Sequence, residues 1–217
     1  MVIPEPADWA TTTEQQVLDA ALRLAPDLGW TAQTATLAGA ACGLSDGETQ
    51  LLTPNGPRDL AALLWRRHDA RALAALATLD PAALKVREKI TRALTARLDA
   101  VEPDAAAVRR LTGFLALPGH LALGARLTWD SADLLWRWAG DTATDENHYS
   151  KRAILAGILA GALNIRLASG REAALAFVDR RIENVMAFEK WKATTQFHPE
   201  SLLTAAATSL GRLRFGG

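Results

Sequence analysis

The residues best able to do chemistry lie close together in the middle of the chain. Asp145 and His148 are three positions apart, which is a metal-ligand spacing on a helix, and Asp141 lies just before them. A di-iron helical bundle needs two Glu-x-x-His motifs and further carboxylates, and the sequence contains no second motif of this kind. Thr144 is a good N-cap, and acidic residues are favoured in the first turn of a helix. This stretch therefore predicts a helix start, with no metal site.

The rest of the sequence gives little support for catalysis. The chain has four histidines, a single cysteine (Cys42) and no glycine-rich phosphate loop. No pattern in it brings a nucleophile to a base, and the lone cysteine fits a reducing compartment. We therefore predict a protein that is not an enzyme and uses no cofactor. A metal-dependent enzyme built on Asp145 and His148 is an alternative that metal analysis would decide.

Composition favours an all-helical protein without a strong electrostatic field. Of the 217 residues, 49% are hydrophobic, and alanine is abundant while β-branched residues are scarce, which favours helix. Lys plus Arg number 24 and so do Asp plus Glu, so no net charge attracts nucleic acid or anionic lipid. Residues 1–10 lack the basic and apolar regions of a secretory signal and the arginines of a transit peptide. We expect a cytosolic protein of bacterial type, or a mature form.

One helix is expected to organise the fold. Residues 153–165 are uncharged and apolar on every face, which is typical of a core helix. About 13 such residues are too few to span a bilayer, which needs roughly 20. Ala153, Gly157 and Gly161 recur every four residues, so a second backbone can approach closely. This spacing favours tight packing, with the wall of a groove as the alternative.

The residues that surround the start of this helix carry a family resemblance. The pattern, Trp136-x-x-Ala139-Gly140-Asp141-x-x-Thr144-Asp145-x-Asn147-x-Tyr149-x-x-Arg152, resembles the signature of the Coq-nine family. The likeness extends, more weakly, from about residue 20 to about residue 191. One position departs from the family pattern, because His148 stands where the family has an aromatic partner for the following tyrosine.

The resemblance implies both a fold and a function. Coq-nine proteins are lipid-binding accessory proteins of ubiquinone biosynthesis with a TetR-like, all-helical fold, and they assist the demethoxyubiquinone hydroxylase. We therefore expect an all-α, TetR-like helical bundle with a helix-turn-helix-like portion (residues 1–57), a lipid-binding bundle (58–192), and a linker with an amphipathic tail helix (193–217). By the same resemblance, the two long helices after the signature would form a homodimer.

A TetR-type transcriptional regulator that binds a hydrophobic effector is the alternative function. Short helices at residues 34–41 and 46–53, joined by a glycine turn, resemble a helix-turn-helix. Between Arg23 and Arg58, however, the sequence has no Lys or Arg. A recognition helix needs cations for the phosphates of DNA, so we predict no nucleic-acid partner.

Capping signals mark the other helices. Thr11 and Glu14 form a capping box for a first helix that Pro26 and Gly29 end. Asp80 before Pro81 predicts a helix to about residue 100. Further helices are expected at residues 59–79, from Pro103 to the break at residues 118–119, and at 121–139 and 171–191. Charged side chains are assigned to exposed faces: Arg66, Arg67 and His68 beside Trp65, and Lys85, Arg87, Lys89, Arg92 and Arg97.

The expected ligand is an isoprenoid lipid or quinone intermediate in an apolar cavity. The residues predicted to bind it come from the helices around residues 111–117, 127–138 and 154–165. They are Leu111, Phe114, Leu115, Leu127, Leu134, Leu135, Trp138, Ile154, Gly157, Ile158 and Gly161.

Two further surfaces are predicted. The polar turn would dock the hydroxylase, with Tyr149 as an interface anchor or, alternatively, as a core residue. The tail would bind a membrane surface through its apolar stripe, which places the protein in the cytoplasm at the inner membrane. The docking residues are Asp141, Asp145, Asn147, His148, Tyr149 and Arg152, and the membrane residues are Leu202, Leu203, Ala206, Leu210 and Leu213.

Overall fold

The computed structural model describes residues 6–142 and 146–194, with side chains from residue 9 to 142 and from 148 to 187. All regular structure in these ranges is helical, which confirms the predicted all-α, TetR-like class. The chain divides into two units, Met1–Val178 and Asp179–Gly217, and the packing described below lies within the first.

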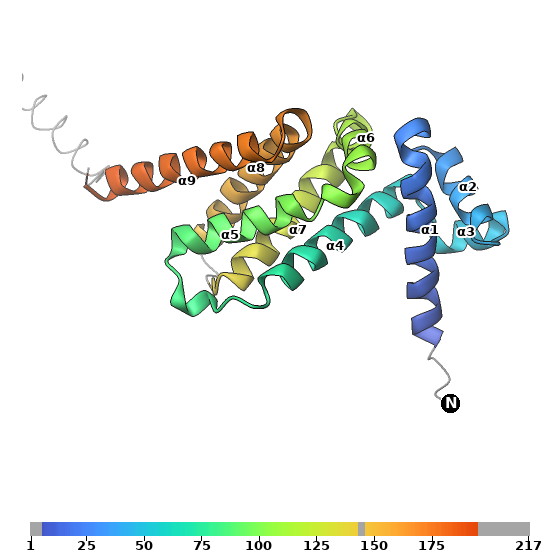
Figure 1. Cartoon of the computed structure of the whole chain (residues 1–217), viewed down its shortest axis with the longest axis horizontal. Coiled ribbons are helices and arrows are strands. Elements are labelled where there is room, and N and C mark those ends of the chain that lie inside the picture. Colours follow the sequence, from blue (N-terminus) through green and yellow to red (C-terminus); the bar gives the residue numbers. More distant parts are fainter. Residues whose placement is uncertain (1–5, 143–145, 195–217) are drawn as a thin grey trace, which may run out of the picture. The chain divides into compact units, whose positions relative to one another are not determined.

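Three helices form the N-terminal portion: α1 (Pro6–Leu28), α2 (Ala32–Ala41) and α3 (Asp46–Leu52). The predicted pair of short helices is confirmed as α2 and α3, and α2 packs on both α1 and α3 (Figure 1). Ser45 and Glu48 form a capping box at the start of α3. Gly39 allows the crossing of α2 and α3, because a Cβ atom there would lie 2.0 Å from Oγ1 of Thr49.

The predicted start of the first helix is wrong. Helix α1 begins at Pro6, so Thr11 lies inside the helix, and Pro26 is also within it. The chain leaves the helix at Gly29, which has a positive φ of 71°. This conformation is easy for glycine and costly for other residues, so Gly29 was the correct stop signal.

The bundle contains α4 (Pro57–Leu76), α5 (Val86–Asp99), α6 (Ala105–Leu115), α7 (Leu121–Trp138) and α8 (Glu146–Ser169), followed by α9 (Arg171–Thr194). Helix α4 packs against α5 and α7, and α7 packs along α8 (Figure 1). The single helix predicted from residue 81 to 100 is interrupted: Asp80 caps a 3-10 turn, Pro81–Ala83, and α5 starts only at Val86.

Leucines from five helices of the bundle fill its core. A fully buried leucine stabilises a fold by about 1.5–3 kcal/mol relative to an exposed one, so this set supplies a large share of the favourable free energy of folding. The fully buried members are Leu60, Leu64, Leu76, Leu94, Leu98, Leu111, Leu135, Leu155 and Leu159.

Several charged side chains are buried, contrary to the sequence-based expectation. Arg97 was assigned to an exposed face, but it has no exposed surface at all. Trp65 and His68 are also buried, and Arg67 is half-buried, so only Arg66 of that basic turn is solvated. The reason is that each of these buried polar groups has a hydrogen-bond partner on another helix. The sequence pattern of a single helix does not reveal such a partner.

Helix α8 is less enclosed than its all-apolar sequence predicted. Leu155, Leu159 and Leu163 are buried, but Ile154 and Gly157 are exposed. By length and composition alone, residues 148–169 could also cross a membrane, with 39% of that stretch buried. A core helix passes the same test, and the packing of α8 on α7 fits this assignment.

Candidate functional site

A cluster of charged residues fixes the start of α8 to the end of α7. The Arg152 side chain on α8 is buried, and its Nε donates a hydrogen bond to Oδ1 of Asp133, 2.5 Å away. Its Nη1 donates to Oδ2 of Asp141 at 3.0 Å and to the carbonyl of His148 at 3.2 Å. Lys151 completes the cluster with a 2.7 Å ion pair to Asp141. We call Asp133, Asp141, Lys151 and Arg152 the signature cluster.

The charges of the signature cluster stabilise one another. Burial alone would raise the pKa of Asp141, but hydrogen bonds from Lys151 and Arg152 lower its pKa below the ordinary value. Burial alone would lower the pKa of Arg152, but its bonds to Asp133 and Asp141 raise that pKa. Asp141 and Arg152 are therefore both charged at neutral pH. This buried ion pair positions the start of α8.

The structure separates the predicted docking residues into two groups. Asp141 and Arg152 bind each other inside the fold, so their assignment to a partner surface is corrected. Tyr149 is 64% exposed, which rules out the alternative that it is a core residue. Its ring centroid lies 6.3 Å from that of Trp129 and 5.1 Å from that of His148. Asp145 and the side chain of Asn147 lie outside the described part of the structure.

The predicted lipid-binding residues do not share one environment. Leu111, Leu115, Leu127, Leu135 and Ile158 are buried, whereas Phe114, Leu134, Trp138 and Gly161 are half-buried, and Ile154 and Gly157 are exposed. A Cβ atom on Gly157 would meet nothing within 4 Å, so this glycine borders open space. A Cβ atom on Gly161 would lie 2.9 Å from the ring of Phe177, so Gly161 allows the two helices to pack closely.

A second buried cluster was missed by the sequence analysis. Asp69 on α4 accepts hydrogen bonds at Oδ1 from Nε of Arg97 on α5 and from Oγ of Ser131 on α7, both at 2.6 Å. Ser131 in turn accepts one from Nε1 of Trp65 at 2.7 Å. The guanidinium of Arg97 lies over the Trp65 ring, 4.8 Å from its centroid. We call Trp65, Asp69, Arg97 and Ser131 the interior cluster.

The interior cluster has unused donors. Within the described residues, neither Nη1 nor Nη2 of Arg97 has a hydrogen-bond acceptor, although both atoms are buried. A buried charged group without partners is costly, so these atoms are well placed to bind oxygen atoms from water or a ligand. A sequence signal existed: Ser131 interrupts the apolar stripe of α7 between Leu127 and Leu135, four residues from each.

Metal binding has no geometric support in the part of the chain that is described. No group of three or more His, Cys, Asp or Glu side chains there is arranged to hold a metal ion. His148 lies beside Tyr149, and Asp141 is bonded to two cations.

Comparisons with known proteins identify the signature region. The COQ9 family model matches residues 121–189. The mitochondrial ubiquinone biosynthesis protein COQ9 of Rattus norvegicus is 26% identical over 208 residues, which is 90% of this chain and 67% of the rat protein. The resemblance to COQ9 is confirmed. COQ9-A of Xenopus laevis is 29% identical over 155 residues, and human COQ9 is 28% identical over 151.

The COQ9 family model covers only part of the chain, and the chain covers only part of its relatives. The chain spans about half the length of the frog and human proteins, 48% in each case. The residues that the COQ9 family model matches include the whole signature cluster and Tyr149, whereas Trp65, Asp69 and Arg97 of the interior cluster precede them. The family model thus covers α7, α8 and most of α9, whereas the rat protein aligns with 90% of the chain.

Proposed function

We propose that this chain is a lipid-binding accessory protein of ubiquinone biosynthesis. It would bind an isoprenoid quinone intermediate and present it to the demethoxyubiquinone hydroxylase without doing chemistry itself. Its relatives are named ubiquinone biosynthesis proteins, and the COQ9 likeness supports the same role here. The exposed surface of α2 and α3 supports no DNA-binding alternative, because the chain has no Lys or Arg between Arg23 and Arg58.

The interior cluster is the observation that carries the ligand assignment. A quinone head group bears carbonyl oxygens that accept hydrogen bonds, and its isoprenoid chain is apolar. Arg97 offers two buried amino groups without acceptors in the described structure, and Leu127 and Leu135 flank Ser131 on the same stripe. Few polar groups within mainly apolar walls are typical of small-molecule sites.

Mass spectrometry of co-purified lipids tests this assignment. We expect an isoprenoid quinone in the wild-type protein and a large loss of it in the double variant Asp69→Leu, Arg97→Met. Replacing both members of a buried ion pair by apolar residues is often neutral for stability, so the fold should remain. Arg58→Met is the matched control, because Arg58 is exposed. A wild-type protein without isoprenoid lipid would contradict the proposed function.

The docking surface is proposed around Tyr149. The signature cluster fixes the N-terminal part of α8, and Tyr149 projects from it beside Trp129. Tyrosine is enriched among residues that dominate binding energy at interfaces. We expect Tyr149→Ala to weaken binding of the purified hydroxylase by roughly tenfold or more while the lipid content stays unchanged. Leu121→Ala, another exposed apolar truncation, is the control.

Membrane association and dimerisation complete the proposal. The relatives are mitochondrial by name, and we propose peripheral association with the inner membrane. Residues 195–217 lie outside the described part, so the membrane-binding role of Leu202, Leu203, Ala206, Leu210 and Leu213 stays a prediction. Flotation with anionic liposomes, before and after truncation at His198, tests it, and sedimentation measures the predicted homodimer.

A further inference from the structure

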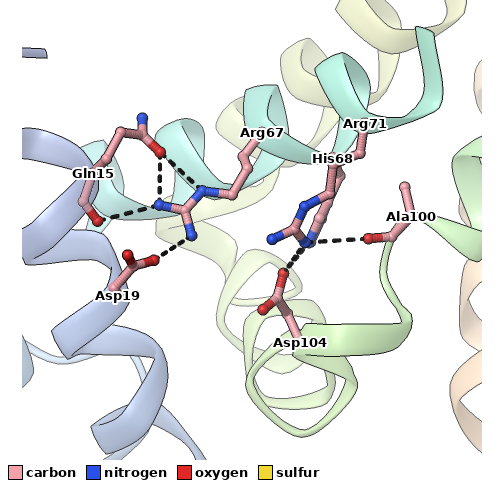
Figure 2. Close-up of polar contacts among 7 residues, drawn as sticks. All are labelled: Gln15, Asp19, Arg67, His68, Arg71, Ala100 and Asp104. Atoms are coloured by element: carbon pink, nitrogen blue, oxygen red, sulfur yellow. Dashed lines mark hydrogen bonds and ion pairs between the residues drawn. The ribbon is translucent and has the colours of Figure 1, made fainter. Parts of the chain in front are cut away.

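A polar pocket of about 400 Å³ lies where α1, α4 and the start of α6 meet. Its volume falls within the range of small-molecule sites. Apolar residues form part of its wall: Leu22, Pro26, Pro103, Ala106 and Ala107. Charged residues form the rest: Asp19, Arg23, Arg67, Arg71 and Asp104. Figure 2 shows how four of these charged side chains are paired.

Arg67 joins α4 to α1 through all three of its guanidinium nitrogens. Its Nε and Nη2 donate to Oε1 of Gln15 at 2.9 and 2.6 Å, and its Nη1 donates to Oδ1 of Asp19 at 2.6 Å (Figure 2). The charges of Arg67 and Asp19 therefore cancel at this side of the pocket. Arg67 therefore builds the wall, with each of its three guanidinium nitrogens already bonded to α1.

Asp104 is neutralised on the opposite side. Its Oδ2 accepts hydrogen bonds from Nη1 of Arg71 and from Nε2 of His68, the latter at 2.9 Å (Figure 2). Burial lowers the pKa of His68, so His68 is neutral and carries its proton on Nε2. Burial alone would raise the pKa of Asp104, but the bonds from His68 and Arg71 lower it, so Asp104 is ionised. The charges of Arg71 and Asp104 therefore cancel.

One positive charge remains in the pocket. Arg23 is exposed and has no hydrogen bond or ion pair with any described residue. Arg71 uses only Nη1, which also donates to the carbonyl of Ala100 at 3.4 Å, so its other guanidinium nitrogens are available to a ligand. The pocket therefore has a net charge of about +1 and an apolar wall on α1 and α6. Arg23 and Arg71 supply its free hydrogen-bond donors.

We propose that this pocket binds a small amphiphilic acid. Its carboxylate would bind between Arg23 and Arg71, since a planar guanidinium matches a carboxylate in geometry and charge. Its apolar body would lie along Leu22, Pro26 and Pro103. A dianion fits less well, because Asp19 and Asp104 stand in the same wall. The site is separate from the interior and signature clusters, so it does not depend on quinone binding.

Calorimetric titration of the full chain with benzoate tests the proposal. Benzamide, a neutral compound of the same shape, and inorganic phosphate serve as comparison probes. We expect saturable binding of benzoate and at least about tenfold weaker binding of the other two, because one charge-assisted hydrogen bond is worth about that much. Equal binding of benzoate and benzamide would overturn the proposal, as would tighter binding of phosphate.

Two variants and one control make the test specific. Arg23→Gln should weaken benzoate binding about tenfold, whereas Arg58→Gln removes the same charge from the exposed start of α4 and should not weaken it. Ala106→Leu should block the pocket without changing any charge, since Ala106 lines it and is otherwise exposed. Equal losses in Arg23→Gln and Arg58→Gln, or full binding by Ala106→Leu with an unchanged circular dichroism spectrum, would contradict the site.

Discussion

Arg152 and Arg97 are both buried, but they differ in how their hydrogen-bond donors are used. Arg152 bonds two carboxylates and a carbonyl through Nε and Nη1. Arg97 bonds one carboxylate through Nε, and its two amino groups have no acceptor within the described residues. Burial lowers the pKa of Arg97, whereas the two carboxylates raise that of Arg152 in spite of burial. Burial alone therefore does not separate the two arginines. The proposed quinone site rests on the two buried amino groups of Arg97 that have no acceptor among the described residues.

The largest expected effect comes from breaking the interior cluster. Asp69→Ala leaves the charge of Arg97 buried without a counterion. We expect the free energy of unfolding to fall by about 3–5 kcal/mol, measured by urea denaturation. The double variant Asp69→Leu, Arg97→Met is the control and should be within about 1 kcal/mol of wild type. A mild effect of Asp69→Ala alone would show that Arg97 finds another partner.

Breaking the signature cluster should cost somewhat less. Arg152→Met leaves Asp133 and Asp141 without their shared cation, but Lys151 still binds Asp141 and Asp133 keeps contact with Arg137. We expect a loss of about 2–3 kcal/mol in the free energy of unfolding, below the range for fully buried pairs. Hydrogen exchange should also rise at the start of α8. Uniform exchange along the whole bundle would contradict a local positioning role.

Acid should affect His68, which precedes Asp69 of the interior cluster on α4, and the signature cluster in different pH ranges. The pKa of His68 is lowered chiefly by burial, with a smaller contribution from the charge of Arg97. As the pH falls, His68 therefore takes up a proton in the unfolded state before it does so in the folded state. Its contribution to the free energy of unfolding is fully present above pH 6.5 and is lost as the pH drops below that value, by at most about 1.4 kcal/mol per pH unit. Asp141, with a pKa lowered from 3.8, should lose its contribution only below about pH 4. His68→Gln should remove the first phase alone.

The smallest effect is expected for Lys151. Its ammonium lies 2.7 Å from Asp141, but the side chain is more than one-third exposed. Exposed ion pairs contribute about 0–1 kcal/mol, so Lys151→Gln should lower the free energy of unfolding by less than about 1 kcal/mol, and 1 M salt should abolish the difference. A loss as large as that of Arg152→Met would mean that the two cations act as a unit.

The sequence predicted the elements better than the contacts between them. Local signals identified the all-α class, the paired short helices, and the stop at Gly29, which has a positive φ. The interior cluster could not be found in this way, because its hydrogen-bonded pairs lie 28 to 66 positions apart in the sequence and each residue looks like an ordinary surface or boundary residue. Only Ser131 within an apolar stripe hinted at it.

The site residues show the same division. The family pattern correctly located the turn between α7 and α8, but it could not tell that Arg152 is buried and Tyr149 exposed. The burial of Arg152 depends on its bonds to Asp133 and Asp141, which a linear pattern does not show. The lipid-lining residues were chosen for being apolar on three helices. In the structure some of these residues are buried and others are exposed; on α8, for example, Ile158 is buried and Gly157 is exposed.

The crossing of α2 and α3 has a consequence for mutational tolerance. Any missense change at Gly39 adds a Cβ atom, and that atom would come within 2.8 Å of Cβ of Thr49, whose hydroxyl is bonded to the carbonyl of Ser45. The neighbouring helix would have to move as a whole. In a library of random variants, Gly39 should therefore accept almost no substitution, whereas exposed positions of the same two helices, such as Leu37 and Leu51, should accept most.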